Sequence, residues 1–528
     1  MSHLTKIACL LLSITVASGA MATDQVRTAS GTVEGFTTPD KKIRIFEGIP
    51  FAAPPVGNLR WRPPQPVSSW TGVRKTTAFG SRCLQGRLAE GMVFRDPGQS
   101  EDCLYLNVWT PAHSADAHLP VMVWIYGGGF QAGSASEPRQ DGAALARKGV
   151  VVVSMNYRLG VFEFFSDPEL TKESPHHASG NYGLLDQAAA LQWVHKNIAA
   201  FGGNPANVTI FGESAGSISV SAHMASPVSE GLFRQAIGES GGVFEWIHRM
   251  QPLAESEQTG AAFAKSMGAP TLAALRAMSA AEILQAALKE NDLPFWPNLD
   301  GYFFSENPWA IYAAGKQAHV PLLAGWNADE HRSAQFFGNL EPTKANYLAK
   351  VHAEFGPNAP AVLKLFPANT EAEMEQSAHD LASAEFITYS TWKWLNMQAE
   401  TGDAPVYRYH FEQAPPPEPG KQYRGVHHAA DIQFVFETLD TENLAWTPDD
   451  RTMSDMMSSY WVNFAKTGNP NGSGLPKWPR YDQKTDYAGM LLQVGPSTEP
   501  HAVPPANRAQ YELLDRIANE RRNTEQRQ

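Results

Sequence analysis

The 528-residue sequence has only three cysteines, which excludes a small scaffold held together mainly by disulfides. It has fewer basic than acidic residues, 42 against 54, and a formal net charge of -12. Such a charge disfavours binding to nucleic acid or to an anionic membrane surface. Beyond the N-terminus, no uncharged apolar run approaches the roughly 20 residues of a membrane-spanning helix. With 43% hydrophobic residues, the chain has enough apolar surface for a folded globular core.

The N-terminus has the pattern of a secretory signal peptide. A lysine precedes an apolar run over residues 7–16, and small residues follow with an Ala-x-Ala pattern at Ala20 and Ala22. We therefore expect residues 1–22 to be removed. Residues 23–528 would then form a secreted or periplasmic protein without stable membrane insertion. The alternative is a mobile N-terminal tail.

Export determines how the cysteines are interpreted. Cys9 lies in the signal peptide and would be lost with it. Cys83 and Cys103 remain as an even pair in an oxidising compartment, which predicts one disulfide between them. The alternative is two buried free thiols.

The apolar segments indicate an α/β fold. Residues 121–126 and 150–153 are continuous apolar runs, typical of strands buried on both faces of a parallel sheet, and residues 208–211 predict a third strand. A helical pattern before the third strand ends at Gly202. Residues 320–324 and 406–409 predict later strands. Strands alternating with helices predict one domain with a large, mostly parallel central sheet flanked by helices.

A nucleophile motif follows the strand at residues 208–211. Gly212-Glu213-Ser214-Ala215-Gly216 is a Gly-x-Ser-x-Gly sequence between a strand and a helical pattern. The glycines let neighbouring backbone approach the serine without a side-chain clash, and the start of the helix favours developing negative charge. The motif predicts Ser214 as a nucleophile; the alternative is a serine in a surface turn.

A run of three glycines, Gly127-Gly128-Gly129, follows the strand at residues 121–126. Backbone N–H groups of such a loop hold the oxyanion in esterases. A phosphate-binding loop is disfavoured because neither Gly-x-Gly-x-x-Gly nor Gly-Lys-Ser/Thr occurs here. The alternative is a plain flexible loop.

These motifs and three further segments resemble the type B carboxylesterase family, which includes cholinesterases and bacterial para-nitrobenzyl-type esterases. The segments are residues 46–55 (FEGIPFAAPP), 101–109 (EDCLYLNVW) and 181–187 (NYGLLDQ), and the resemblance extends from about Gly31 to Phe436. It implies an α/β-hydrolase fold. It also implies hydrolysis of small-molecule carboxylic esters through an acyl-enzyme, with no metal and no organic cofactor.

The resemblance also assigns roles to single residues. The oxyanion donors are the backbone N–H groups of Gly128, Gly129 and Ala215. The acid of the catalytic triad is Glu330, the last residue of an Asn-x-Asp-Glu segment. The family usually has glycine at the next position, where this chain has His331.

The base of the triad is chosen between two neighbouring histidines, His427 and His428. In the family pattern it lies three residues before an acidic residue that leads into an aromatic-Val-Phe run. Asp431 begins such a run here, so His428 is the predicted base, and His427 is interpreted as a packing or solvent-facing residue. The order Ser, Glu, His is that of α/β-hydrolases. Glu213 and Ser240 are expected around the site, either ordering water or making structural hydrogen bonds.

The substrate is less clearly indicated. The segment between the paired cysteines lines the active-site gorge in this family, and here it contains Phe94 and no tryptophan, which disfavours choline esters. Arg82, Arg87 and Arg95 suggest esters that carry carboxylates, although ordinary surface charge is the simpler explanation. Phe295-Trp296 is interpreted either as part of the acyl pocket or as core. The sequence carries no signal of oligomeric state.

Two other function classes compete with the hydrolase. The first is a catalytically silent binding or adhesion protein on the same fold, but such proteins lose members of the triad. The second is a Ser-x-x-Lys acyl enzyme, which Ser390 and Lys393 suggest. These two residues lie in a predicted helix without the companion motifs of that class, so chance explains them better.

Overall fold

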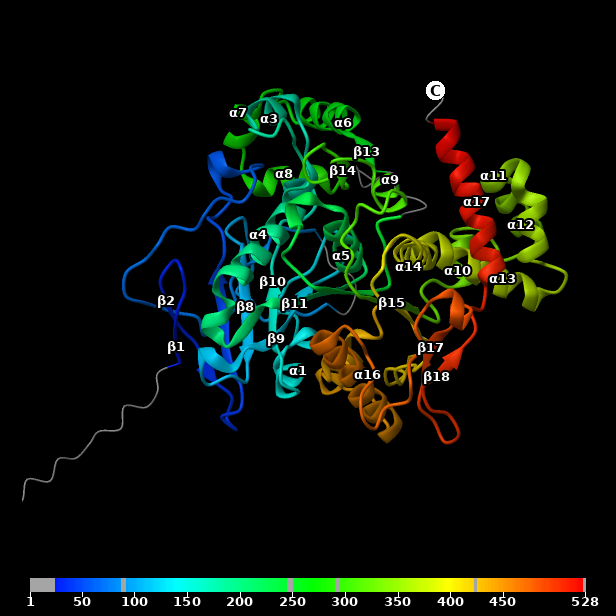
Figure 1. The fold of residues 1–528 in the computed structure, drawn as a ribbon. Helices are drawn as coiled ribbons and strands as arrows, with labels where there is room; N and C mark the ends of the chain where they lie inside the picture. The colour runs from blue at the N-terminus through cyan, green and yellow to red at the C-terminus, as the bar shows by residue number, and fades with distance from the viewer. Residues whose placement is uncertain (1–23, 87–91, 245–249, 290–294, 422–424, 526–528) are drawn as a thin grey trace, which may run out of the picture.

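The computed structural model describes residues 24–86, 92–244, 250–289, 295–421 and 425–525, so the predicted signal peptide lies outside them. Within these residues the centre is an 11-stranded sheet (Figure 1). The strands, in their order across the sheet, are β18 (His501–Val503), β17 (Gly489–Leu492), β16 (Val406–Phe411), β15 (Leu322–Asn327), β12 (Gln235–Glu239), β11 (Gly203–Glu213), β9 (Leu119–Ile125), β10 (Val151–Met155), β8 (Tyr105–Thr110), β4 (Arg44–Pro50) and β3 (Phe36–Thr37).

The middle of this sheet is parallel, as the continuous apolar runs predict. From β17 to β10 every neighbouring pair of strands is parallel, and antiparallel pairs lie outside this block at both edges. All of β10 and the second halves of β9 and β11 are buried. Both faces of the sheet are thus shielded from water. Because the strands are parallel, their carboxyl ends lie at one edge, where ligands bind in such folds.

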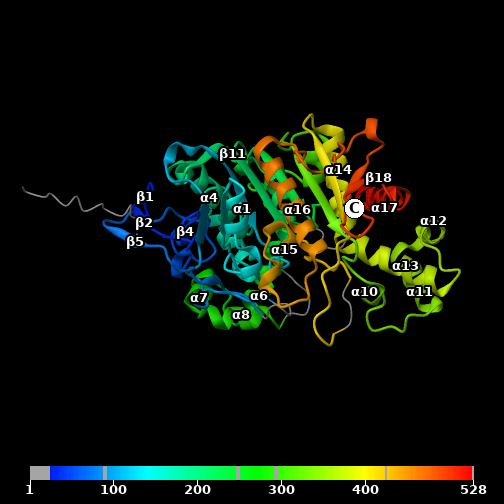
Figure 2. The same ribbon diagram turned by 90° about the horizontal axis from the view of Figure 1, so that it is seen from below.

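Helices cover the sheet on both faces. Helix α5 (Ala215–Ala225) packs against β9, β11 and β12, while α16 (Pro448–Thr467) packs against β9 and β11 from the other side (Figure 1). Helices α10 (Ser333–Phe337), α11 (Lys344–Phe355), α12 (Ala359–Leu365) and α13 (Glu371–Ser383) gather at one end with α17 (Arg508–Glu525) (Figure 2). No helix of the described residues is both long and apolar enough to cross a membrane.

The predicted elements are confirmed, with shifted ends. The strand expected from residue 320 begins at Leu322, because Pro321 has no N–H to donate to a neighbouring strand. Helix α4 (Tyr182–Asn197) stops four residues before the end of its apolar pattern, and a 3-10 turn over Ile198–Phe201 completes it. Gly202 then reverses the chain with φ of 82°, which glycine adopts at no steric cost.

The predicted disulfide is present between Cys83 and Cys103, whose Cα atoms lie 4.9 Å apart. Both residues are buried, and the bond closes a segment separated by 20 positions in sequence. This segment includes Met92, which lines the cavity described below. The bond therefore restrains one wall of that cavity as well as the unfolded chain.

We expect the double substitution Cys83→Ser/Cys103→Ser to lower the free energy of unfolding by about 3 kcal/mol, because a loop of this length no longer restricts the unfolded state. Urea denaturation of both proteins under oxidising conditions measures the loss. Adding reductant to the wild type must reproduce it and must leave the variant unchanged. Equal stability of the two oxidised proteins would contradict the prediction.

Candidate active site

The candidate nucleophile sits at a strained corner between a strand and a helix. Strand β11 ends at Glu213, helix α5 begins at Ala215, and Ser214 between them has φ of 55° and ψ of -122°. A Cβ on Gly216 would lie 1.9 Å from the carbonyl oxygen of Ile125 at the end of β9. The corner therefore forms only with glycine at this position, and the serine hydroxyl stays half-exposed above the sheet.

The glycine loop runs alongside this corner because β9 and β11 are parallel neighbours. A Cβ on Gly127 would lie 2.9 Å from Cβ of Ser214, and one on Gly128 would lie 2.1 Å from the carbonyl oxygen of Ala132. Gly128 also has φ of 108°, which other residues rarely adopt. Glycine is thus required for the loop to pass the nucleophile.

Three backbone amides beside the nucleophile are available to a ligand. Among the described residues, the N–H groups of Gly128, Gly129 and Ala215 donate no hydrogen bond to another protein group. Ala215 opens helix α5, whose first-turn N–H groups point away from the helix body. Unpaired amides beside a serine hydroxyl are suited to hold an oxygen that gains negative charge.

A buried carboxylate holds the candidate histidine. Nδ1 of His428 lies 2.5 Å from Oε2 of Glu330. The other oxygen, Oε1, accepts hydrogen bonds from the backbone N–H of Asn327, at 2.7 Å, and from the hydroxyl of Ser240. Glu330 is 3% exposed. Both oxygens are fixed, so the orientation of the imidazole is fixed through Nδ1.

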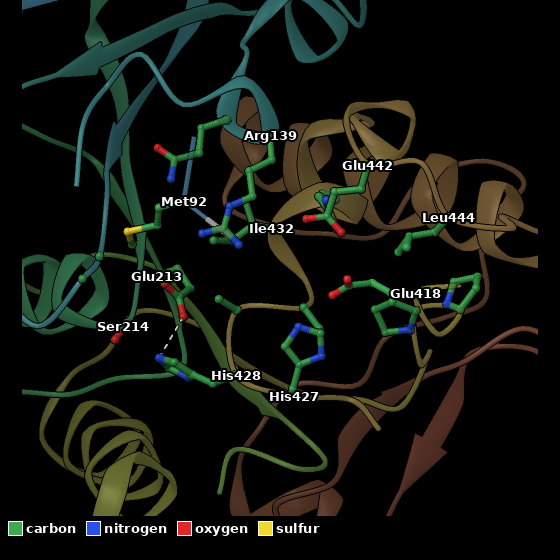
Figure 3. Close-up of a pocket in the computed structure, with 18 of the residues that line it drawn as sticks. Met92, Arg139, Glu213, Ser214, Glu418, His427, His428, Ile432, Glu442 and Leu444 are labelled. Atoms are coloured by element: carbon green, nitrogen blue, oxygen red, sulfur yellow. Dashed lines mark ion pairs between the residues drawn. The ribbon is translucent and has the colours of Figure 1, made fainter. Parts of the chain in front are cut away.

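The other imidazole nitrogen contacts a second carboxylate. Nε2 of His428 lies 3.1 Å from Oε1 of Glu213, as the dashed line in Figure 3 shows. This contact is an ion pair rather than a hydrogen bond, because Oε1 of Glu213 has no hydrogen-bond partner among the described residues. It is attractive only while the ring is protonated. Within the described residues, the ring makes its Nε2 contact to Glu213 and no hydrogen bond to Ser214, although both residues line the same cavity.

The charges around the ring act in opposite directions. Burial lowers the pKa of His428, but the carboxylates of Glu213 and Glu330 raise it by more, so the net pKa is about 9. Burial also raises the pKa of the Glu213 carboxyl, to about 8, against the attraction of His428. With pKa values of about 9 and about 8, this pair keeps a proton at neutral pH, and the imidazole must lose it before it can act as a base.

These groups border a cavity of about 360 Å³ (Figure 3). It combines apolar, acidic and basic walls. Among the described residues, its lining includes Met92, Gly127, Gly128, Gly129, Arg139, Glu213, Ser214, Phe386, Pro415, Pro416, Pro417, Glu418, His427, His428, Ile432, Glu442 and Leu444.

An aromatic stack supports one side of the histidine. The ring of Phe386 meets His428 edge-on at 4.8 Å, and His331 stacks flat on Phe386 at 3.9 Å. Phe386 lies in a π-helical turn, Ala384–Thr388, and such turns are frequent at functional sites. The backbone of His331 exchanges two hydrogen bonds with the hydroxyl of Ser383 on α13. The family pattern has glycine at position 331. Here His331 holds the ring of Phe386 in place, and that ring in turn supports the imidazole of His428.

The structure decides between the alternatives that the sequence left open for several residues. His427 lines the cavity. Phe295 is buried against Phe165 and Phe263, so it belongs to the core. Ser390 is buried and donates to its own helix, at Ile387.

Of the three arginines that suggested carboxylate-bearing esters, the two described ones, Arg82 and Arg95, do not line the cavity. Arg82 pairs with Asp96 at 2.5 Å, and Arg95 pairs with Asp141 at 2.8 Å. Arg87 lies outside the described residues. The described arginines are ion-paired surface charges, as the simpler explanation had it.

Sequence reasoning missed much of the cavity wall, above all the proline loop at 415–417, Arg139, Phe386 and Glu442. The prolines stand in no catalytic motif, although they precede the two histidines by about ten residues. The other three residues stand in no motif, and only the folded chain brings them to the cavity.

Comparison with known proteins agrees with this geometry. Residues 22–509 match the model of the carboxylesterase family. The chain belongs to this family, and it is a carboxylic ester hydrolase with the α/β-hydrolase fold.

Relatives with assigned activities match over most of their length. Fumonisin B1 esterase of Sphingopyxis macrogoltabida is 38% identical, covering 89% of this chain and 86% of the relative. Para-nitrobenzyl esterase of Bacillus subtilis is 38% identical, covering 87% and 93%. Human cocaine esterase is 35% identical, covering 95% and 94%.

The contact between Glu213 and His428 predicts a shift in pH dependence. Glu213→Gln keeps the shape and removes the negative charge that raises the pKa of His428, so this pKa falls below about 9. The base is active when neutral, so the acidic limb of kcat/KM against pH moves down, by about 1 to 3 pH units. Glu418→Gln, on the outer wall, is the control and leaves the limb in place. An unshifted limb in Glu213→Gln would contradict the assignment.

The aromatic stack predicts a separate effect on turnover. His331→Ala frees Phe386 and lets the imidazole of His428 rotate, so kcat falls about 2- to 10-fold while KM changes little. His331→Phe keeps the flat stack and retains the wild-type kcat. Steady-state kinetics on one neutral ester compares the three proteins. Equal losses in the alanine and phenylalanine variants would refute a role for stacking.

Proposed function

We propose that this protein is a secreted serine carboxylesterase in which Ser214, His428 and Glu330 form the catalytic triad. The observation that carries the proposal is the meeting of Ser214 and His428 in one cavity, with Glu330 bound to the far nitrogen of the imidazole. Glu330 lies 116 positions after Ser214 in the sequence (330 − 214), and His428 lies 98 positions after Glu330. The fold brings all three to one edge of the sheet.

The proposed reaction has two halves. The neutral imidazole of His428 takes the proton of Ser214, and the serine oxygen attacks the ester carbonyl. The N–H groups of Gly128, Gly129 and Ala215 hold the resulting oxyanion. Collapse of this intermediate breaks the bond to the alcohol, which leaves with the proton from His428. A water molecule, deprotonated by the same ring, then releases the acid and restores Ser214.

Glu330 and Glu213 have different tasks in this proposal. Glu330 keeps the Nδ1–H tautomer, so Nε2 faces the reaction, and it stabilises the imidazolium. Glu213 competes for Nε2 in the protonated ring, at 3.1 Å. Loss of the proton removes that attraction and frees Nε2 for the serine. Ser240 positions Glu330 through its hydroxyl.

Export and a single domain complete the proposal. Residues 1–22 act as a cleaved signal peptide, and residues 23–528 form one hydrolase domain. The disulfide between Cys83 and Cys103 supports this, because such bonds persist in oxidising compartments. By their names, the relatives act on fumonisin B1, para-nitrobenzyl esters and cocaine, so we expect a comparably sized small-molecule ester here.

The alternative is a binding protein on the same fold that does not catalyse. It is disfavoured because Ser214, Glu330 and His428 are all retained and two of them line an open cavity. The Ser-x-x-Lys reading is also disfavoured, since Lys393 pairs with Asp515 at 2.8 Å and Ser390 is buried.

We expect Ser214→Ala and His428→Ala each to lower kcat for a simple ester by about 10⁴-fold or more, because the nucleophile and its base act as a unit. Ser390→Ala serves as the control and keeps wild-type activity. Labelling with an organophosphate, followed by peptide mapping, identifies the nucleophile directly. Label on Ser214 supports the proposal, whereas label on Ser390 or no label at all contradicts it.

A further inference from the structure

Arg139 gives the cavity a feature that ester hydrolysis alone does not require. It lies in a 3-10 turn, Pro138–Gln140, which follows the glycine loop. Among the described lining residues, the basic side chains are Arg139 and the two histidines, and the histidines are explained by the triad and its neighbour. Glu137 balances the charge of Arg139 through Nε, so the question is what the rest of the guanidinium, on the side of the cavity, is there to bind.

The base of this guanidinium is held rigidly. Nε of Arg139 donates to Oε1 of Glu137, and Oε2 of that buried carboxylate accepts from Nε2 of Gln140 at 2.7 Å. Gln140 in turn accepts from Nε1 of Trp124, on β9, at 2.9 Å. The backbone carbonyl of Arg139 accepts from the hydroxyl of Thr438 at 2.6 Å. The side chain is therefore pre-organised before any ligand arrives.

The two terminal nitrogens of Arg139 remain available. Figure 3 shows them reaching into the cavity between Glu213 and Glu442. Among the described residues, neither terminal nitrogen makes a protein hydrogen bond. A planar pair of N–H donors with its Nε side fixed matches the two oxygens of a carboxylate.

The carboxylates of Glu213 and Glu442 attract Arg139 electrostatically, but among the described residues neither accepts a hydrogen bond from its terminal nitrogens. Glu213 is engaged with Nε2 of His428. Glu442 has an exposed side chain and makes no ion pair within the described part of the chain. Its carboxylate lines the same cavity and attracts the guanidinium of Arg139 without a hydrogen bond, so it competes with a ligand for that group.

We propose that Arg139 binds a free carboxylate of the substrate, and that the enzyme prefers half-esters of di- or tricarboxylic acids to neutral esters. This rests on the proposed function, because the ester bond of the same molecule must reach Ser214. The carboxylate takes the two terminal nitrogens of Arg139 while the scissile carbonyl lies against the glycine loop. Arg139 is thus a specificity residue and takes no part in proton transfer.

The test compares two esters that differ by one charge. Monoethyl adipate carries a free carboxylate, and diethyl adipate carries the same chain with that group capped; release of ethanol is measured for both. In wild type we expect the ratio of kcat/KM, monoester over diester, to exceed one. Arg139→Met lowers this ratio at least 10-fold and leaves the diester within about threefold of wild type. Arg95→Met, an arginine outside the cavity, leaves the ratio unchanged.

A second variant is expected to change the ratio in the opposite direction, and its result holds even if Arg139→Met fails to fold. Glu442→Gln removes the competing carboxylate from an exposed position, so the ratio rises several-fold. Free adipate supports the same conclusion if it competitively inhibits diester hydrolysis in wild type and loses at least 10-fold in affinity in Arg139→Met.

The outcomes separate this inference from the proposed function. Suppose that wild type hydrolyses the diester and that Arg139→Met lowers kcat/KM equally for both esters, or leaves the ratio within twofold. Carboxylate recognition by Arg139 is then wrong, while the proposed esterase activity is unaffected. A wild-type preference for the diester also contradicts carboxylate recognition, because the acidic residues of the cavity would then repel the charged ester. If wild type cleaves neither ester and Ser214 takes no organophosphate label, the proposed function itself fails.

Discussion

The site depends on how closely the ends of β9 and β11 approach each other. The glycine at position 216 sits against the carbonyl of Ile125, and Gly127 sits against Ser214, at separations that admit no Cβ. This contact sets the angle at which β11 turns into α5, exposes the serine, and lays the glycine loop beside it. The other groups reach their places from strands that end at the same edge of the sheet.

Above this corner, the chemistry is arranged by carboxylates. The imidazole lies between Glu330 and Glu213, and each carboxylate interacts with a different nitrogen. Glu330 is locked by Asn327 and Ser240, while Glu213 makes a contact that lasts as long as the ring carries its proton. A fixed partner on one side and a reversible one on the other couple the position of the ring to its charge.

The sequence predicted the fold and the residues that stand in motifs, and it did so for physical reasons. Ser214 and the glycine loop are found because backbone crowding demands glycine at set positions, and the strands because burial on both faces demands continuous apolar runs. Arg139, Phe386 and Glu442 were missed, since their roles come from packing between distant segments and leave no local pattern. The family resemblance located the segment of Glu330 but gave no hint that His331 stacks on Phe386.

The wall built from Pro415, Pro416 and Pro417 has a consequence for how such an enzyme diversifies. Proline has no N–H, so this stretch offers a substrate rigid apolar surface and carbonyl acceptors but no donors. It follows the end of β16 at Phe411 and precedes the two histidines in the sequence. Insertions or deletions there reshape the outer cavity without moving any strand of the sheet, so substrate range can drift while the reacting groups stay in place.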